Sequence, residues 1–565
     1  MKARSLLLSL LSTLVLSCAT VPPPAPRPAL DLKIVNGRIV DGTGAPWFRG
    51  DVGVRGDTIV RVGDLADVSA ARTIDAGGRV VAPGFIDLLG QSERVVLDDP
   101  KVEAKVRQGV TTEVSAEGWS PGPNSEAASR TGRTDERAGW PTLGAFFDQL
   151  AAKGSAINFA LFMGATNARS IVIGSIDRVA TEEELARMEA LVDEGMRDGA
   201  IGLSTSLIYV PATFAPTEEL VRLARVASRY GGVYFSHIRT EGEGILDALD
   251  EAIRIGKEAS IPVNVWHLKT SGTPNHGRMG EVLARIEAAR REGVDIAANM
   301  YPYTASSTGL TTLVPTWALE GGYQEFLGRL KDPSTRARIA EYVRTDSIPG
   351  HTGGAEGILV TRIPGTGLDA LEKKNLAQIA AELGLDPVEA LFHLYERSNS
   401  TPSGVFFKMS EPDVQTALRH PFVAFGSDSG SVPESRRASG AHPRAYGTFP
   451  RVLGHYSRDL GLLSLEEAVR KMTSLAAARA QLADRGLIRP GMKADIVVFD
   501  PDAIADRATF QDPHQYSVGV EHVIVNGSLV LESGTMTGNL PGRPLRGPGF
   551  TPGKRTGATG PGQQR

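Results

Sequence analysis

Two histidines stand at the ends of predicted β-strands. His237 follows the apolar run 233–236, and His267 follows the similar run 262–266. Because neighbouring strands of a parallel sheet end at the same face, the two imidazoles could share one metal ion there. A lone histidine at a strand end is more often a hydrogen-bonded structural group. The pair therefore indicates a metal site only if other ligands reach the same face.

Two acidic residues follow predicted strands in the same way. Glu117 comes after the stretch 109–116, and Asp428 comes after the stretch 422–427. Two histidines and one glutamate with an open fourth position form a common catalytic zinc set. Asp428 could then be the general base that takes a proton from a metal-activated water. The alternatives are a salt-bridged loop carboxylate for Glu117 and a helix cap for Asp428.

The middle of the chain alternates between predicted strands and helices. The strands span 158–163, 200–205, 233–237, 262–267 and 295–300, and the helices span 181–192, 218–229, 244–259 and 280–291. Repeated β-α units of this length predict an α/β fold with a parallel sheet. Their number fits a (β/α)8 TIM barrel over residues 81–485. Residues 318–400 break the alternation, so we expect an inserted segment there.

The two ends of the chain have a different pattern. Segments 30–80 and 486–545 contain short β-rich runs, with Asn-Gly turn signals at 36–37 and 526–527. Two such pieces at opposite ends most simply form one small β-sandwich, built from both terminal segments. Residues 546–565 are rich in glycine, proline and threonine, and we expect them to be disordered.

The N-terminus has the features of an export signal. A short basic start precedes the apolar run 5–16, which is too short to span a membrane as a helix. The sequence Val15-Leu16-Ser17-Cys18 then resembles a bacterial lipobox, which predicts a signal peptide over 1–18 and a proline-rich tether over 19–29. Ala19 after the cysteine favours a periplasm-facing outer-membrane lipoprotein, held to the membrane only by a lipid on Cys18. The alternative is an ordinary secretory signal and a secreted or soluble periplasmic protein.

The composition narrows the range of partners. Acidic residues (65) nearly balance basic ones (61), and this balance gives no basic footprint for nucleic acid. We therefore expect a small-molecule substrate and no nucleic-acid partner. The single cysteine excludes an intrachain disulfide, and the sequence leaves the oligomeric state open.

Several short motifs occur in a fixed order along the chain. In chain order they are Ala82-Pro83-Gly84-Phe85-Ile86-Asp87, Gly109-Val110-Thr111-Thr112, His267-Leu268-Lys269, Tyr301-Pro302-Tyr303-Thr304-Ala305, Gly426-Ser427-Asp428, His442-Pro443-Arg444 and the stretch 447–456. Together they resemble the D-aminoacylase, or N-acyl-D-amino-acid deacylase, branch of the amidohydrolase superfamily, over roughly residues 30–545. This resemblance implies a (β/α)8 barrel enzyme that hydrolyses the amide bond of N-acyl-D-amino acids.

The resemblance also implies roles for individual residues. His237 and His267 would bind one zinc ion, and Glu117 stands near the place of a metal-binding cysteine. Asp428 would shuttle the proton as base and then acid. The groups implied to contact a substrate with a free carboxylate are Lys269, Tyr301 and Arg444 at its α-carboxylate and Tyr209 at its reacting carbonyl.

Two positions depart from the family pattern. The family has a His-x-His pair just after Phe-Ile-Asp, and here those positions are Leu89 and Gln91. Leucine cannot ligate a metal, so we expect one zinc ion and the loss of the second site. The sequence leaves open whether Gln91 or Glu93 contributes to metal binding.

Two other functions remain open at this point. The same chemistry could act on another amide, such as a dipeptide, a lactam or a cyclic amide. The chain could also be a non-catalytic binding protein on a decayed enzyme scaffold, which the loss of the histidine pair at Leu89 and Gln91 would explain. Retention of Glu117, His237, His267 and Asp428 together argues against decay.

Overall fold

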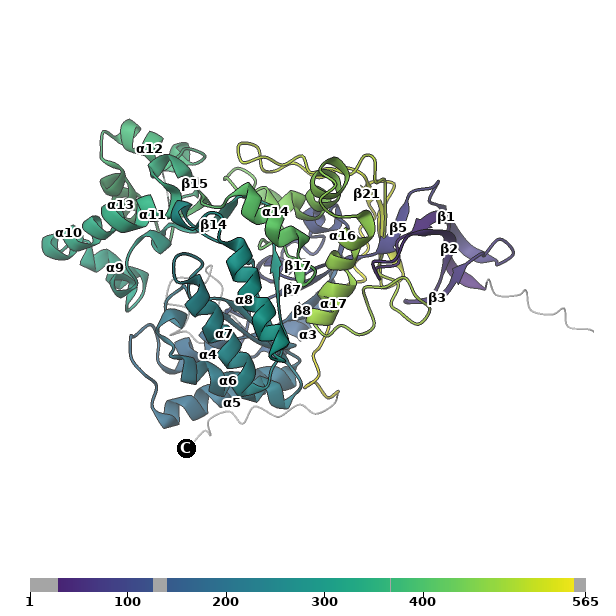
Figure 1. Ribbon diagram of the computed structural model, residues 1–565, viewed down its shortest axis with the longest axis horizontal. Helices are drawn as coiled ribbons and strands as arrows, with labels where there is room; N and C mark the ends of the chain where they lie inside the picture. The colour runs from purple at the N-terminus through teal and green to yellow at the C-terminus, as the bar shows by residue number, and fades with distance from the viewer. Residues whose placement is uncertain (1–28, 125–139, 366, 553–565) are drawn as a thin grey trace, which may run out of the picture.

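The computed structural model describes residues 29–124, 140–365 and 367–552. A central barrel carries a β-sheet at one end and a mainly helical body on the opposite side (Figure 1). The predicted signal peptide with Cys18, and all of the predicted tether except Ala29, lie outside the described residues.

Eight strand positions form the barrel, as the alternating pattern predicted. In order they are β6 (Phe85–Asp87), β7 (Val110–Ser115), β8 (Asn158–Leu161) continuing as β9 (Met163–Gly164), β10 (Gly202–Ser206), β11 (Val233–His237), β12 (Val263–Val265), β13 (Ile296–Met300) and β17 (Val423–Phe425). Paired neighbours are parallel. The first and last strands meet where Leu88 N donates to Phe425 O at 3.3 Å.

Amphipathic helices cover the outside of the barrel. They include α3 (Leu143–Lys153), α4 (Ala165–Val172), α5 (Glu182–Asp198), α6 (Thr217–Arg229), α7 (Ile245–Ala259), α8 (Met279–Arg291), α14 (Glu411–Arg419), α16 (Leu465–Met472) and α17 (Ser474–Arg479). Helix α5 begins with the predicted capping box between Thr181 and Glu184. It ends at Gly199, whose φ of 112° favours glycine. Its buried face includes Leu185 and Met188.

One sheet contains strands from both ends of the chain. Its strands are β1 (Leu30–Ile39), β2 (Phe48–Arg55), β3 (Thr58–Gly63), β4 (Ala70–Asp75), β5 (Val80–Pro83), β18 (Ile496–Phe499), β19 (Val520–Val525), β20 (Ser528–Glu532) and β21 (Thr535–Met536). The two ends meet where β5 pairs antiparallel with β18. Because β5 runs almost directly into β6, this sheet also fixes where the first barrel strand begins.

A buried polar cluster links this sheet to the barrel. Asp495, just before β18, pairs with Arg485 and accepts hydrogen bonds from Asn158 Nδ2 at 3.1 Å and Asn526 N at 2.7 Å. Asn158 belongs to barrel strand β8, whereas Asn526 follows β19 of the sheet. Asp495 and Arg485 are 4% and 5% exposed, so each of these groups depends on the others for its hydrogen bonds.

The inserted segment forms a body with its own hydrophobic core, seen at the upper left of Figure 1. It contains β14 (Ala305–Gly309), α9 (Tyr323–Arg329), α10 (Pro333–Tyr342), α11 (Ile348–Thr352), β15 (Ile358–Arg362), α12 (Leu376–Leu383), α13 (Pro387–Arg397) and β16 (Ser403–Phe407). This body is wider than residues 318–400, because β14 and β16 pair with each other as its two connections to the barrel.

The first residues of the predicted disordered tail pack on the barrel. Gly547 N donates to Gly199 O at 2.8 Å. The guanidinium of Arg546 lies 4.8 Å from the ring centre of Phe147. Composition alone predicted disorder from residue 546, but these contacts hold Arg546 and Gly547 against the barrel, and the described chain continues to Pro552.

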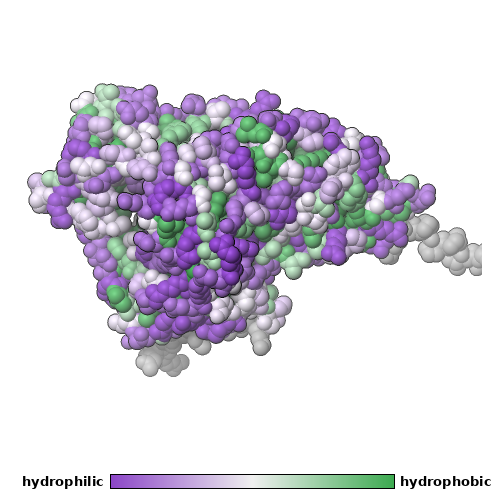
Figure 2. All heavy atoms as spheres, in the orientation of Figure 1, coloured by the Kyte–Doolittle hydropathy of each residue, from purple (hydrophilic) through white to green (hydrophobic). Residues whose placement is uncertain are grey.

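The face shown in Figure 2 is mostly hydrophilic, with hydrophobic residues in small groups. Within the described residues, no helix has the length and apolar character that crossing a bilayer requires.

The cluster around Asp495 yields a stability prediction. We expect Asp495→Ala to lower the free energy of unfolding by about 3 kcal/mol, because it leaves the Arg485 charge buried without its partner. Asp484→Ala is the matched control, since Asp484 is half exposed and lies 3.5 Å from the same arginine. Denaturant unfolding of both variants measures the difference. Equal effects would show that the buried cluster does not join sheet and barrel energetically.

Candidate metal centre and active site

Three predicted ligands converge at the carboxyl ends of the barrel strands. Glu117 Oε1 lies 2.8 Å from His237 Nδ1 and 3.2 Å from His267 Nε2, and the two nitrogens are 3.0 Å apart. All three residues are buried. A tetrahedral zinc ion with bonds near 2.0–2.1 Å holds its donors about 3.3 Å apart. The donor types and their spacing therefore fit a single metal ion.

The backbone gives these side chains their direction. His237 is the last residue of β11, His267 comes two residues after β12, and Glu117 comes two residues after β7. His267 has a φ of 37°, and Ala116 beside Glu117 has a φ of 79°. Left-handed backbone of this kind costs free energy in non-glycine residues, and it concentrates at functional sites. The sharp turns aim three separate strand ends at one point.

Glu241, which no sequence pattern indicated, lies behind both imidazoles. Its Oε1 pairs with Lys269 and lies 2.9 Å from His267 Nδ1 and 3.8 Å from His237 Nε2. Burial raises the pKa of Glu241, but Lys269 and the two histidines lower it well below its usual range. An ionised Glu241 can accept the Nδ1 proton of His267, which leaves Nε2 free to bind a metal.

The site favours positive charge at His267. Burial and Lys269 lower the pKa of this imidazole, but Asp428, Glu241 and Glu117 outweigh them and raise it to about 9. The same surroundings that hold a proton on the imidazole also attract a metal ion. Metal binding at Nε2 must therefore displace a proton.

Asp428 lies beside the three ligands and contacts Arg444. Its Oδ2 is 2.7 Å from Arg444 Nη1, and its Oδ1 accepts a hydrogen bond from Gln91 Nε2 at 3.2 Å. Its own backbone is left-handed, with a φ of 50°. It does not cap a helix; its N–H donates to Leu89 O at 2.7 Å across the closure of the barrel.

The two positions that replace the histidine pair have different surroundings. Leu89 is fully buried in an apolar cluster with Trp266 and other core residues. Gln91 Nε2 donates to Glu117 Oε2 at 3.1 Å as well as to Asp428. Glu93 is buried, and its charged neighbour is Arg94 at 3.4 Å; it is not one of the three clustered ligands.

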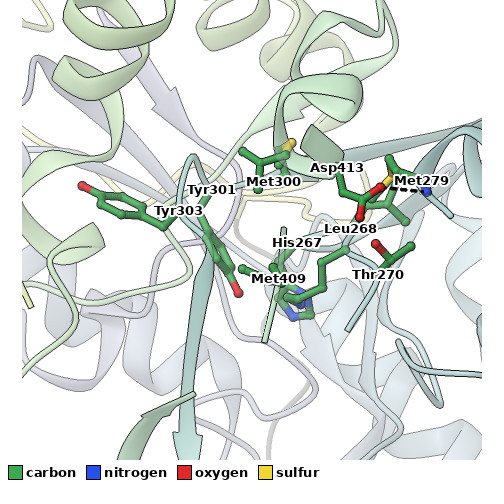
Figure 3. A pocket seen from close by; sticks show the side chains of 11 residues that line it. His267, Leu268, Thr270, Met279, Met300, Tyr301, Tyr303, Met409 and Asp413 are labelled. Atoms are coloured by element: carbon green, nitrogen blue, oxygen red, sulfur yellow. Dashed lines mark hydrogen bonds between the residues drawn. The ribbon is translucent and has the colours of Figure 1, made fainter. Parts of the chain in front are cut away.

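The predicted substrate-contacting residues surround the same centre. Arg444 is buried with its guanidinium 4.5 Å from the ring centre of Tyr301, and Tyr301 lies 6.5 Å from the His267 ring. In Figure 3 Tyr301 and Met409 lie beside His267, whereas Tyr303 points away. Arg444 Nε and the Tyr301 hydroxyl have no hydrogen-bond partner among the described residues. Unpaired buried donors of this kind are suited to an anionic ligand.

Tyr209 and Lys269 are tied into the site by other partners. The Tyr209 ring lies 5.3 Å from that of His237, and its hydroxyl is 2.7 Å from Thr308 Oγ1 of the inserted body. The Lys269 ammonium contacts Glu241 and lies 2.7 Å from His267 Nδ1. In this arrangement the charge of Lys269 is neutralised by Glu241.

Two further buried lysines did not emerge from the sequence. Lys105 is fully buried and donates to Asp87 Oδ2 and Ser427 Oγ, both at 2.7 Å. Lys408 is 8% exposed and directly follows β16. Neither lies at a predicted strand end of the barrel, so spacing alone gave no signal for them.

The barrel, the three clustered ligands and the adjacent aspartate define a metal-dependent hydrolase. The chain belongs to the amidohydrolase family, whose model matches residues 72–531. It is 39% identical to a D-aminoacylase of Alcaligenes xylosoxydans xylosoxydans over 521 residues, which cover 91% of this chain and 97% of that protein. This similarity confirms the family resemblance found in the motifs.

Solved structures give the same result. A D-aminoacylase with a binuclear metal centre, described by one-metal activation and second-metal attenuation, matches with a TM-score of 0.78 and 38% identity over 92% of this chain and 100% of that one. An N-acyl-D-glutamate deacylase from Bordetella bronchiseptica, complexed with zinc and a phosphonate inhibitor, matches with a TM-score of 0.78 and 34% identity over 92% and 99%. The (β/α)8 fold and the hydrolase class are thus confirmed.

The position of Glu241 predicts a metal-binding defect. We expect Glu241→Gln to weaken zinc binding by about 10- to 100-fold, because His267 loses the carboxylate that fixes its tautomer. Glu243→Gln, two residues away on an exposed side chain, is the matched control. Competition with a chelator measures the affinity of each folded variant. An unchanged affinity in Glu241→Gln would contradict this role.

Proposed function

We propose that this chain uses one zinc ion to hydrolyse the amide bond of N-acyl-D-amino acids or closely related small amides. The observation that carries the proposal is the cluster of Glu117, His237 and His267 with Asp428 beside it. The names of the D-aminoacylase and N-acyl-D-glutamate deacylase relatives support the substrate class. The buried apolar packing of Leu89 supports a single ion, because it removes one ligand of a second site.

Zinc held by the three ligands would supply a Lewis acid that polarises a carbonyl and lowers the pKa of a coordinated water. Asp428 takes the proton of the attacking water through its carboxylate. Arg444 Nη1, 2.7 Å from Oδ2, holds this carboxylate in place. Asp428 then returns a proton to the nitrogen of the leaving amine, so the same group acts first as base and then as acid.

The substrate carboxylate would bind on the Arg444 and Tyr301 side of the site. Their unpaired Nε and hydroxyl groups offer two donors to a carboxylate, and the planar guanidinium suits bidentate contact. Lys269, which is paired with Glu241, lies 5.6 Å from the ring centre of Tyr301. Tyr209, beside His237, is placed for contact with the reacting carbonyl. Holding one end of the substrate fixes the scissile bond relative to Asp428.

We also propose the cellular location that the N-terminal sequence indicates. Export as a lipoprotein anchored through Cys18 would place the catalytic barrel at the periplasmic side of a bacterial membrane. Labelling with a radioactive fatty acid, lost in Cys18→Ala, tests this location independently of the activity.

The proposed role of Asp428 predicts the behaviour of an isosteric variant. Asp428→Asn should lower kcat by about 100-fold or more, because an amide cannot accept the proton of the attacking water. The zinc content should stay near one ion per chain. Asp502→Asn, on an exposed residue, serves as the control. The measurement is steady-state kinetics with N-acetyl-D-methionine, followed by metal analysis.

A substrate panel separates the proposal from its alternatives. N-acetyl-D-methionine should be cleaved much faster than its L enantiomer, than dipeptides and than cyclic amides. Faster cleavage of a dipeptide or lactam would move the chain to another amide substrate. Zinc-loaded protein that cleaves none of them would favour the non-catalytic binding protein.

A further inference from the structure

Gln91 lies between the metal-ligand carboxylate and the proposed base. Its Nε2 donates to Glu117 Oε2 at 3.1 Å and to Asp428 Oδ1 at 3.2 Å. The other oxygen of each carboxylate is already engaged. Glu117 Oε1 faces the two histidines, and Asp428 Oδ2 faces Arg444. Gln91 therefore donates to the two carboxylate oxygens that do not face the histidines or Arg444.

The chemistry of the two partners fixes the orientation of the amide. Both are carboxylates that accept hydrogen bonds, so only the NH2 end of Gln91 fits between them. That group has two N–H donors, one for each carboxylate. The reverse orientation would place an amide oxygen against two negative charges. One neutral side chain thus donates a hydrogen bond to each of the two carboxylates.

The bridge meets an electrostatic need of this site. Glu117 and Asp428 approach the same amide nitrogen, so two negative charges lie close together in a buried setting. A second metal ion is one way to hold such charges, and the related D-aminoacylase has a binuclear centre. Here Leu89 offers no ligand. Two N–H dipoles are the remaining favourable partner between the carboxylates.

We infer that Gln91 is a positioning residue that takes over the organising role of a second cation. It holds Glu117 so that Oε1 faces the histidines, and it holds Asp428 at a fixed distance from that ligand. Gln91 itself is not a metal ligand. The enzyme is therefore built for one ion, and not merely deprived of another.

The buried side chain of Lys105 fixes the main chain on both sides of Asp428. Lys105 Nζ donates to Ser427 Oγ and to Ser429 O, the residues on either side of Asp428. It also pairs with Asp87, which accepts a hydrogen bond from Ser427 N at 2.8 Å. The main chain of Asp428 is fixed by these contacts. Its side chain is then directed by Gln91 and Arg444.

The test replaces the amide and keeps its length. Gln91→Met removes both donors. We expect it to bind zinc about tenfold more weakly, to shift the visible spectrum of the cobalt-substituted protein, and to lower kcat 10- to 100-fold with KM within threefold. Gln324→Leu, on the exposed face of α9, is the control, and circular dichroism confirms folding of both.

Two results would overturn this role. An unchanged cobalt spectrum and unchanged zinc affinity in Gln91→Met would show that the bridge positions nothing. A crystal structure with zinc in which a Gln91 atom lies about 2.1 Å from the ion would make it a ligand. The spectrum and the affinity need no substrate, so they remain informative even if the proposed amide hydrolysis fails.

A separate observation concerns Lys408, at the junction of the inserted body and the barrel. Its carbonyl accepts a hydrogen bond from Gly272 N at 2.8 Å, in the loop after β12. The next residue, Met409, lines the pocket beside His267 and Tyr301 (Figure 3). The Lys408 side chain is largely buried, and its ammonium lies 5.9 Å from the ring centre of Phe406; it forms no ion pair within the part of the chain that the structure describes.

Charged groups of the active site act on the ammonium of Lys408. Burial lowers the pKa of Lys408 to about 8; Glu241 acts to raise this pKa, whereas Lys269 and Arg444 act to lower it. Lys269 is already paired with Glu241, and Arg444 with Asp428. Lys408 is the lysine of this group that still lacks an anion.

The site holds three carboxylates and three cations besides His267, whose proton a bound metal displaces. They are Glu117, Glu241, Asp428, Lys269, Arg444 and Lys408. A divalent ion then leaves an excess of two positive charges. The α-carboxylate of an N-acyl amino acid neutralises one of them.

We propose that Lys408 binds a second carboxylate, so that dicarboxylic N-acyl amino acids are preferred. This inference rests on the proposed amide hydrolysis. The second carboxylate could belong to the side chain or to the acyl group. N-acetyl-D-glutamate and N-succinyl-D-leucine separate these two sources, and N-acetyl-D-leucine lacks both.

The kinetic test compares Lys408→Met with Lys408→Arg. We expect the methionine variant to lose 10- to 100-fold in kcat/KM for the better dicarboxylic substrate and less than threefold for N-acetyl-D-leucine. The arginine variant should recover most of the loss. Equal losses on all three substrates, or a wild-type preference for N-acetyl-D-leucine, would overturn the inference. Failure to cleave any of them would instead refute the proposed function.

Discussion

The convergence of one carboxylate and two imidazoles within 3.2 Å of one another is the interaction on which the site depends. Three polar groups taken from water are costly to bury unless a cation or a set of hydrogen bonds compensates them. Left-handed backbone at Ala116, His267 and Asp428 aims the groups inward and adds to this cost. Such backbone is strained, so its stability must come from the packed barrel around it.

Glu241 shows how the surroundings decide which atoms can bind a metal. A neutral imidazole has one N–H and one lone pair, so a ligand nitrogen needs a hydrogen-bond acceptor behind its other nitrogen. Glu241 lies behind both histidines, at 2.9 Å from one and 3.8 Å from the other. Lys269 keeps this carboxylate ionised, as the lowered pKa of Glu241 indicates. Lys269 therefore favours metal binding although it is itself a cation, because it keeps Glu241 ionised between itself and the histidines.

Much of the fold and the ligand set could be predicted from the sequence, for a clear physical reason. Strand ends such as His237 and His267 are marked by apolar runs that stop at a polar residue, and the capping box at Thr181 marks a helix start within four residues. Glu241, Lys105 and Lys408 could not be found in this way, because their partners come from distant segments. The limits of the inserted body were also missed, since the pairing of β14 with β16 joins residues about a hundred positions apart.

The replacement of the histidine pair also shows that contacts in the fold reveal what a sequence pattern cannot. In the sequence, Leu89 and Gln91 indicate only that two histidine ligands are missing, and missing ligands suggest a decayed site. In the fold they have opposite surroundings: Leu89 packs with Trp266, and Gln91 forms hydrogen bonds with both carboxylates of the site. In a decayed site we would expect the buried carboxylates to have lost partners, and a buried carboxylate without a partner destabilises the fold. Here each oxygen of the two carboxylates has a polar partner. Lys105 also donates hydrogen bonds to the residues on either side of Asp428. These contacts support the proposal that Gln91 organises a site for one ion, and they argue against decay of the site.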